Sequence, residues 1–441
     1  MSMFRQAGRL RGLAPSVLLI ATLTPGPAAG ASIQDPASAP AATAVPLSLR
    51  DAIQEALGHN PGLQASREQV EQARAQVAIA TALPDPSLFA ETLGQTKALS
   101  PGTRNEVDLG LGVTLPFPGK TGLRRRVATA DLHAAELAFT QLQQQVAAQA
   151  VQAFDALLVA QRHAEDLEQG RQYAADFLAK TQARFTGGTV AKVDVVKAQV
   201  DLAQAQNDLI ANQRAIATAR AALNRVLGRA AGSPLTTADQ LTAPGALPAL
   251  ADLERLAAAS RPELRSLAAQ QEGARAASKL ARRFWLPDFN LAAGRNSIEG
   301  SPLTFTTTLA VGFPIFFWQH QRGEIAAASH REQELAADVA DQQAQVALDV
   351  RTSYADAATA LQQAVFIRDQ LLPEAREVYR VAALSYGLGG SSALELLDAK
   401  RTLLDAESQY VDALGSANDA RAALELAVGA PLPPATEGAR P

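Results

Sequence analysis

The chain is an internal duplication with an offset of about 200 residues. RFTGGTVAKVDVV, which starts at residue 184, aligns with SYGLGGSSALELL, which starts at residue 385. AALNRVLG at residue 221 aligns with AALELAVG at residue 422. Alanine-rich helices can match by chance, but chance would not keep the proline, glycine and strand landmarks in the same order. We therefore expect two copies of one structural unit.

Each copy has the same plan. A helix starts near residue 48 or 250, is interrupted at Pro61 or Pro262, and stops at a Leu-Pro-Asp sequence. Strands follow at 87–96 and 106–115 in the first copy, and at 289–296 and 303–313 in the second. Long helices over 123–185 and 323–386 then lead to a glycine break and a returning helix. At 1.5 Å per residue such helices reach roughly 90 to 100 Å, too long for a compact domain.

The N-terminus has the order of a secretory signal peptide. Arg5, Arg9 and Arg11 precede the apolar run LAPSVLLIATL, and small residues follow it. The run is short for a bilayer span, although a membrane anchor is the rival interpretation. We expect a signal peptide at 1–31, a flexible linker at 32–46, repeat 1 at 47–228, a connector at 229–248, repeat 2 at 249–429 and a flexible tail at 430–441.

Composition narrows the class of protein. Hydrophobic residues make up 47% of the chain but aromatic residues only 5%, so alanine supplies much of the apolar content and helix-on-helix packing is favoured. The net charge is -4 and the basic residues are spread along the chain, so the sequence does not indicate a basic surface that binds nucleic acid. There is no cysteine, and the five histidines form no metal-binding or nucleophile motif. We expect no enzymatic activity, no cofactor and no metal site.

The second strand of each copy alternates between two unlike faces, as in EVDLGLGVTL and LTFTTTLAVGF. A transmembrane β-strand needs about 9–11 residues with apolar side chains on one face. The predicted lipid-facing residues are Val107, Leu109, Leu111, Val113, Leu115, Leu303, Phe305, Leu309, Val311 and Phe313. Thr307 is the exception in this pattern. Soluble hairpins packed on a helix are the alternative.

Strands in lipid would require assembly of several copies. One chain offers four strands with two open edges, and unsatisfied backbone groups in hydrocarbon are costly, so the sheet must close. The smallest known barrels have about eight strands. Two, three or four copies would give eight, twelve or sixteen strands, and this arithmetic does not choose among them.

The two glycine breaks share a pattern: an aromatic residue, a glycine three places later and an acidic residue six places after that. With the duplication, the hairpins and the signal peptide, residues 47 to 429 resemble the outer membrane factors of the TolC family. The resemblance implies a mainly α fold in which homotrimers close a 12-stranded membrane β-barrel on an α-helical periplasmic tunnel. It implies a passive outer membrane channel of a Gram-negative bacterium, working with a periplasmic adaptor and an inner membrane pump in efflux or type I secretion.

The resemblance also assigns roles at the glycine breaks, which would be the periplasmic tips. Tyr386 matches the gate tyrosine, and Glu395 and Asp398 match two acidic residues at the constriction. They lie three residues apart and so share a helix face. Ser391 replaces a usual basic residue, which departs from the family's tyrosine–arginine latch. A capping box between Ser392 and Glu395 is the purely structural alternative, and the two roles can coexist.

The remaining tip residues are predicted to shape the turns and meet the adaptor. Gly188 and Gly389 should adopt positive φ. Adaptor contacts are predicted at Thr189, Val190, Gly390 and Ser391, and Asp194 matches Glu395 in the first copy. The alternative function is a periplasmic coiled-coil adaptor or scaffold without a barrel. The cargo stays open among metal cations, small-molecule drugs and polypeptides.

Overall fold

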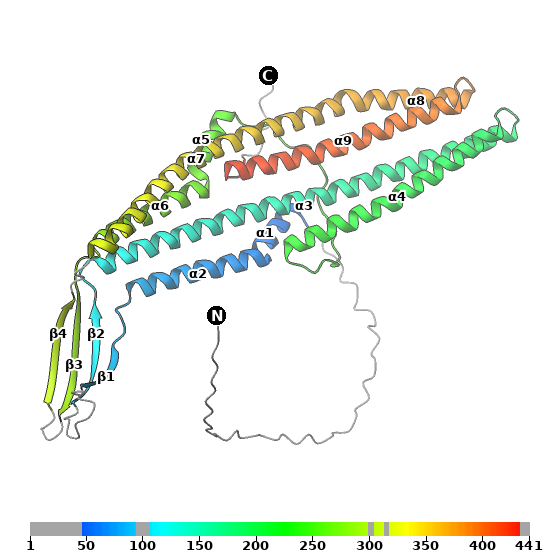
Figure 1. Ribbon diagram of the computed structural model, residues 1–441. Coiled ribbons are helices and arrows are strands. Elements are labelled where there is room, and N and C mark those ends of the chain that lie inside the picture. Colours follow the sequence, from blue (N-terminus) through cyan, green and yellow to red (C-terminus); the bar gives the residue numbers. More distant parts are fainter. Residues whose placement is uncertain (1–45, 94–105, 299–303, 313–316, 433–441) are drawn as a thin grey trace, which may run out of the picture. The chain divides into compact units, whose positions relative to one another are not determined.

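The computed structural model describes residues 46–93, 106–298, 304–312 and 317–432 (Figure 1). These described residues belong to one compact unit. The predicted signal peptide and most of the predicted linker lie outside the described residues. Among the described helices, none is long and apolar enough to cross a membrane.

The elements repeat in the predicted order. The first copy contains α1 (Leu49–His59), α2 (Pro61–Thr81), β1 (Ser87–Leu93), β2 (Glu106–Leu115), α3 (Lys120–Thr186) and α4 (Lys192–Leu227). The second contains α5 (Leu250–Ser260), α6 (Pro262–Arg282), β3 (Asp288–Ile298), β4 (Thr304–Gly312), α7 (Phe317–Phe366), a π-helical turn (Ile367–Leu371), α8 (Leu372–Leu388) and α9 (Ala393–Val428). The bounds of β2 are those that the alternation predicts.

The long helices of the two copies differ in the regularity of their hydrogen bonding. The helix α3 runs unbroken for 67 residues, roughly 100 Å at 1.5 Å per residue. Its counterpart, predicted as one helix over 323–386, is likewise helical without a break from 317 to 388, but it contains the π-helical turn, which the prediction did not include. Pro373 lies in the first turn of α8 and has no N–H to donate to the preceding turn, so the backbone changes its hydrogen-bond register there.

The four strands form one antiparallel sheet in the order β1-β2-β3-β4. The two copies therefore meet at β2 and β3, where Gly110 is opposite Gly294. A Cβ on Gly110 would come within 2.6 Å of the Ala293 carbonyl oxygen, and one on Gly294 within 2.8 Å of the Leu109 carbonyl oxygen. Only glycine permits this close approach of the two backbones.

One face of the sheet is apolar and uncovered. Leu109 pairs with Arg295, Leu111 with Ala293 and Val113 with Leu291, so these residues share a face. Exposed fractions of 41% to 73% are found for Leu88, Leu109, Leu111, Leu291, Phe305, Leu309 and Val311. Val113 and Leu115 are half-buried. Leu303, Phe313 and the side chain of Val107 lie outside the described residues.

Helices continue from the sheet and pack side by side. Contacts join α2 to α3, α3 to α6 and α6 to α7, in the order of the strands to which these helices connect (Figure 1). Beyond them, α3 pairs with α4, and α7 and α8 pair with α9, giving two helical hairpins. The helices α3 and α9 also contact each other, so the hairpins of the two copies share a seam.

Each copy has a hydrophobic core of its own. One cluster draws its residues from 47–241 and another from 247–432. The connector takes part: Leu235 is buried, Leu47 N donates to Thr236 O at 2.8 Å, and Ala238 N donates to Leu47 O at 2.9 Å. Leu432 falls in the predicted tail but is buried in the second cluster, so packed structure extends at least to that residue.

Candidate gate at the hairpin tips

The tip of the first hairpin is a tight turn between α3 and α4. Gly188 has a φ of 74°, in the left-handed region that glycine tolerates. Thr189 closes the turn, because its N and its Oγ1 each donate to Arg184 O at 3.0 Å. Val190 is half-buried, and Gly188 and Thr189 are exposed. At the start of α4, Asp194 Oδ1 lies 4.0 Å from Lys197 Nζ.

The tip of the second hairpin uses a similar turn and a stronger cap. Gly389 has a φ of 83°, and Gly390 N donates to Ser385 O at 2.9 Å. Ser391 is half-buried and donates from Oγ to Ala382 O at 3.2 Å. The capping box is present: Glu395 N donates to Ser392 Oγ at 3.2 Å, and Ser392 N donates to Glu395 Oε2 at 3.1 Å.

Tyr386 connects the two tips. Its side chain is 1% exposed, and its hydroxyl lies 2.9 Å from Thr181 Oγ1 of α3. Arg184 donates from Nη1 to Tyr386 O at 2.8 Å and also lies over the tyrosine ring, 4.7 Å from its centroid. Phe177 packs against the same ring at a centroid distance of 5.5 Å. These contacts hold the end of α8 against the end of α3.

A buried ion pair and an apolar cluster reinforce this junction. Lys400 Nζ of α9 lies 2.5 Å from both carboxylate oxygens of Asp201 in α4, and the lysine side chain is 8% exposed. The cluster contains Phe177, Ala198, Tyr386, Ala393 and Leu396, which come from all four tip helices. The two hairpins are therefore tied together near their tips by polar and apolar contacts.

Glu395 and Asp398 line a shared groove of about 540 Å³ between α8 and α9. Both carboxylates are exposed in the single chain. Glu377 adds a third acidic group, while Val378 and Val381 supply an apolar wall. The structure thus places the two predicted acidic residues together and Tyr386 apart from them, in the contact between the two hairpins.

The seam between α3 and α9 carries the buried carboxyl groups of Asp155, Asp166 and Glu407. Burial and the nearby Asp419 raise the pKa of Asp155 to about 7, and burial also raises the pKa of Asp419. Farther toward the tips, burial raises the pKa of both Asp166 and Glu407. These groups are therefore more stable with a proton in the folded chain than in water.

Sequence reasoning missed Thr181 and Arg184 as partners of Tyr386. Arg184 directly precedes the aromatic residue of the repeated pattern in the first copy, where the second copy has Ser385. A basic residue at that place in one copy only was the available signal. Ser391 does lack a basic group, but a tyrosine–arginine contact still exists because Arg184 of the first copy provides it.

Comparison with known proteins identifies the family. The family described as "Outer membrane efflux protein" matches residues 52–229 and 253–430. The two matches begin 201 residues apart, which is the offset of the duplication. The cobalt-zinc-cadmium resistance protein CzcC of Cupriavidus metallidurans is 23% identical over 397 residues, covering 88% of this chain and 92% of CzcC.

Solved structures share the fold. The outer membrane channel OprN superposes with a TM-score of 0.75 at 20% identity, covering 86% of this chain and 89% of OprN. The outer membrane protein VceC of Vibrio cholerae superposes with a TM-score of 0.73 at 20% identity, covering 87% of this chain and 96% of VceC. The arrangement of helices and strands is thus that of outer membrane channels.

These matches confirm the expected fold and class of function. The chain is an outer membrane efflux channel and not an enzyme, and its helical tunnel lies in the periplasm. Its homotrimeric assembly and its adaptor and pump partners are those predicted, and the alternative of an adaptor or scaffold has no support. The chain belongs to the outer membrane efflux protein family.

Proposed function

We propose that the contact between Tyr386 and the first hairpin is the latch of a periplasmic gate. The observation that carries this proposal is the burial of Tyr386 at 1% exposure, with its hydroxyl, carbonyl and ring each engaged by a residue of α3. Movement of α8 away from α3 breaks all of these contacts together. The gate is closed while the contacts persist and opens when α8 and the start of α9 move.

The strength of the latch suits a switch. Each hydrogen bond contributes about 0.5–1.5 kcal/mol net, and an arginine over an aromatic ring about 0.5–1 kcal/mol. Each chain therefore holds its tip closed with about 1.5–4 kcal/mol, assuming that the contacts add. A docked adaptor can open such a gate if it binds the open tips more tightly by a similar amount. Its proposed contacts are Thr189, Val190, Gly390 and Ser391.

The acidic groove next to the latch sets the charge of the constriction. In a trimer, Glu395 and Asp398 of three chains would form a ring of carboxylates that attracts cations. Asp398→Asn should therefore weaken the block of single channels by divalent cations without opening the gate. Asp405→Asn, on an exposed turn farther along α9, is the matched control. Equal block in both variants would remove Asp398 from the constriction.

The latch itself is tested by conductance. Tyr386→Phe removes only the hydroxyl that meets Thr181, and Arg184→Ala removes the contacts with the tyrosine carbonyl oxygen and ring. Both variants, and more strongly their combination, should raise the single-channel conductance of trimers in planar bilayers. Tyr410→Phe deletes the same hydroxyl farther from the tip and should leave conductance unchanged. Unchanged conductance in the double variant would exclude the latch.

A second candidate concerns the cargo. CzcC, whose name refers to cobalt, zinc and cadmium resistance, matches nearly the whole chain, and the exposed acidic groove suits the passage of cations. We therefore propose divalent metal cations as cargo. Deletion of this chain in its host should raise cell-associated zinc and cobalt and lower tolerance to both metals, with unchanged tolerance to organic antibiotics. The opposite pattern would assign organic cargo.

A further inference from the structure

The groove between α8 and α9 holds acidic groups without a cation from the same groove. Among its described lining residues are Glu377, Glu395 and Asp398, and none is a lysine or an arginine. Glu377 is bound by Arg380 of its own helix at 2.5 Å, and Glu395 accepts from Ser392 N in the capping box. Within the described part of the chain, the carboxylate of Asp398 makes no hydrogen bond or ion pair.

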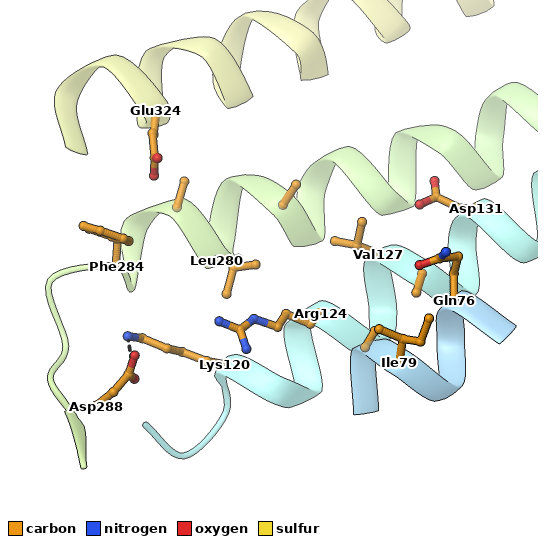
Figure 2. Close-up of a pocket in the computed structure, with 14 residues that line it drawn as sticks. Gln76, Ile79, Lys120, Arg124, Val127, Asp131, Leu280, Phe284, Asp288 and Glu324 are labelled. Carbon is orange, nitrogen blue, oxygen red and sulfur yellow. Dashed lines mark hydrogen bonds and ion pairs between the residues drawn. The ribbon is translucent and has the colours of Figure 1, made fainter. Parts of the chain in front are cut away.

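The groove where the strands give way to helices is different, because a single chain supplies both charges there. Figure 2 shows Lys120 of α3 beside Asp288 of β3. The lysine Nζ donates to Asp288 Oδ1 at 2.9 Å and to Leu286 O at 2.8 Å, and Arg124 also lines this groove of about 610 Å³. A cation that compensates the acidic groove at the tips would instead come from another molecule.

The first repeat carries lysines where the second carries acids. Lys197 of α4 occupies the position equivalent to Asp398, 201 residues away, and Lys192 is the first residue of the same helix. Both lysines are exposed, and Lys197 Nζ lies 4.0 Å from Asp194 Oδ1, at the outer limit of an ion pair. The starts of α4 and α9 thus differ in the sign of their exposed charge, and each is suited to meet the other.

Apolar side chains accompany these charges on faces that the single chain leaves uncovered. Spacings of three and four residues place three valines of α4 on one side of the helix. They are 55%, 47% and 63% exposed: Val193, Val196 and Val200. Ala198, on the opposite side, is buried in the cluster that joins the tips. On the wall of the acidic groove, Val378 and Val381 are 52% and 51% exposed.

The two faces lie at the same level along the tunnel. Asp201 of α4 binds Lys400 of α9 at 2.5 Å, and Lys400 is two residues before 402, the position equivalent to Asp201. Equivalent positions of the two repeats are therefore level within a chain. Rotation about the threefold axis of the trimer keeps this level from one copy to the next. Lys197 is then level with Asp398 of a neighbouring copy, and Val381 lines the groove with that aspartate.

We propose that α4 of one copy docks on the groove between α8 and α9 of the next copy in the trimer. The three exposed valines of α4 pack on Val378 and Val381, and Lys197 pairs with Asp398 of the neighbouring copy. The valines supply most of the attraction, while the ion pair selects the register, because exposed ion pairs contribute little to stability. This docking concerns assembly, and it holds whether or not Tyr386 is the latch of the gate.

The test uses disulfide trapping, for which the chain offers a clean background because it has no cysteine. Val196→Cys combined with Val381→Cys should give covalent trimers on non-reducing gels after mild oxidation of purified trimers. Ile210→Cys combined with Val381→Cys is the matched control. Ile210 is also exposed on α4 but lies 14 residues farther from the tip, roughly 21 Å along the helix, beyond the reach of a disulfide.

Charge reversal tests the ion pair in the same assay. Lys197→Glu should lower the rate of disulfide formation between Val196→Cys and Val381→Cys about fivefold, because it places like charges together. Adding Asp398→Lys should restore the rate. Equal rates in the presence and absence of Lys197→Glu, or no restoration by Asp398→Lys, would remove this pair and with it the proposed register.

Other outcomes overturn the docking itself. These are the absence of covalent oligomers, a disulfide confined to single chains, or equal trapping by the Ile210→Cys control. If the double variant does not assemble, the single variant Val196→Cys tests the same contact, since its thiol should be labelled more slowly in the trimer than in the unassembled chain. Protection of that thiol only after an adaptor is added would assign the face to the adaptor instead.

Discussion

The two repeats share one backbone plan but differ in how their hairpins are held. In the first, α3 is continuous and the tip has no side-chain cap on α4. In the second, a π-helical turn precedes Pro373, and a capping box fixes the start of α9. The capping box and the two acidic groove residues thus belong to the repeat whose long helix contains the π-helical turn, while Thr181 and Arg184 of the first repeat contact Tyr386. Duplication has thus given one hairpin with a regular long helix and one whose long helix contains a π-helical turn.

The π-helical turn, called the joint below, lies next to α8, the helix that the proposed gate would move. The π-helical turn precedes α8, and α8 carries Tyr386 near its end. Residues 166–170 occupy the equivalent place in α3, where the helix is regular and Gly170 allows close packing against Leu404. We interpret α3 as the scaffold and α8 as the element that swings. The following predictions test this difference from the largest expected effect to the smallest.

A proline introduced at the equivalent position of α3 should destabilise that helix. Gln172 is the position in α3 that corresponds to Pro373, and it is exposed in the helix interior. Gln172→Pro should destabilise the chain by about 3 kcal/mol or more, because it removes a helix hydrogen bond and clashes with the preceding turn. Thermal unfolding of the trimer measures this loss, with Gln172→Ala as the control.

Replacing the proline in the second repeat should stabilise the hydrogen bonds of the π-helical turn. Pro373→Ala restores the missing N–H, so the amides of residues 367–371 should exchange hydrogen more slowly than in the wild type. The amides of 166–170 should be unaffected. Equal exchange at the two places in the wild type, or a Gln172→Pro variant with wild-type stability, would contradict the division into scaffold and joint.

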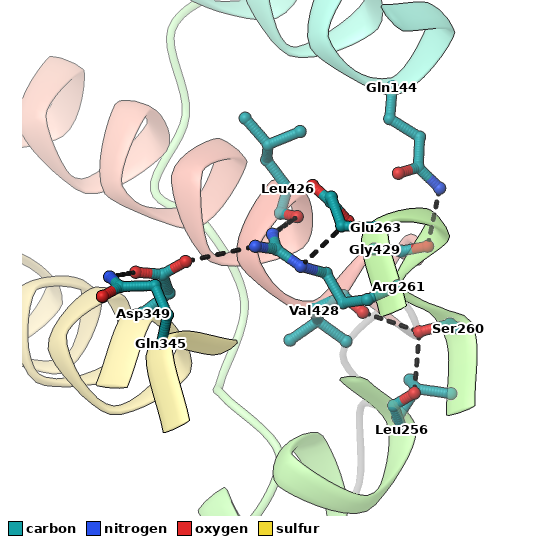
Figure 3. A network of polar contacts seen from close by, with 10 residues as sticks. All are labelled: Gln144, Leu256, Ser260, Arg261, Glu263, Gln345, Asp349, Leu426, Val428 and Gly429. Atoms are coloured by element: carbon teal, nitrogen blue, oxygen red, sulfur yellow. Dashed lines mark hydrogen bonds and ion pairs between the residues drawn. The ribbon is translucent and has the colours of Figure 1, made fainter. Parts of the chain in front are cut away.

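The second comparison concerns the start of α2 and α6. Asn60 caps α2 and donates to Val226 O at 3.0 Å, whereas Arg261 binds Leu426 O, Asp349 and Glu263 (Figure 3). Arg261→Ala should cost about 2–3 kcal/mol, since it leaves a part-buried carbonyl and the Glu263 carboxylate without their partner and leaves Asp349 with Gln345 alone. Asn60→Ala should cost about 1 kcal/mol, the usual value of a helix cap. Equilibrium unfolding of both variants measures the two losses of stability, and equal losses would contradict this prediction.

The seam between the repeats should be weakened as the pH rises. The pKa of Asp155 is about 7 in the folded chain and about 3.9 when unfolded, so the folded state holds the extra proton between these values. Stability from this group is therefore largest below about pH 4 and is lost as the pH rises to about 7. Asp155→Asn should reduce the loss of stability between pH 5 and pH 8 by about 2 kcal/mol. Asp176→Asn, on an exposed part of α3, should leave it unchanged.

The smallest expected losses of stability distinguish the capping role of Glu395 from the effect of its charge. Glu395→Ala removes half of the capping box and should cost about 1 kcal/mol, whereas Glu395→Gln keeps a side-chain oxygen for Ser392 N and should cost less. Asp194→Ala, at the matching place in the first repeat, should cost about 0.5 kcal/mol at most. Chemical unfolding compares the three variants. If Glu395→Gln is as unstable as Glu395→Ala, the carboxylate charge and not the cap stabilises α9.

Much of the fold could be predicted from local signals. The prolines at 61 and 262 mark helix starts, the alternation around Leu109 marks β2, and the glycines at 188 and 389 mark the turns. These features depend on neighbouring residues along the chain, which a sequence displays directly. The family pattern at the glycine breaks then supplied the class of function.

Contacts between distant residues could not be predicted in the same way. Tyr386 meets Thr181 and Arg184 about 200 residues away, and Arg124 shares a groove with residues of α2, α6 and α7. Such pairs depend on how the hairpins pack, and no local period encodes that packing. The π-helical turn was missed for a different reason: Pro373 was visible, but a proline can kink, end or re-register a helix, and packing decides which.

The separation of the two cores bears on how the chain folds during export. The first cluster is complete with residues 47–241, and Leu47 is already held by residues 236–238 of the connector. A chain that emerges from its N-terminus into the periplasm can therefore close its first repeat before the second has been delivered. That finished repeat then offers α3 and β2 as a template on which the second repeat assembles. Duplication thus divides one long folding problem into two successive shorter ones.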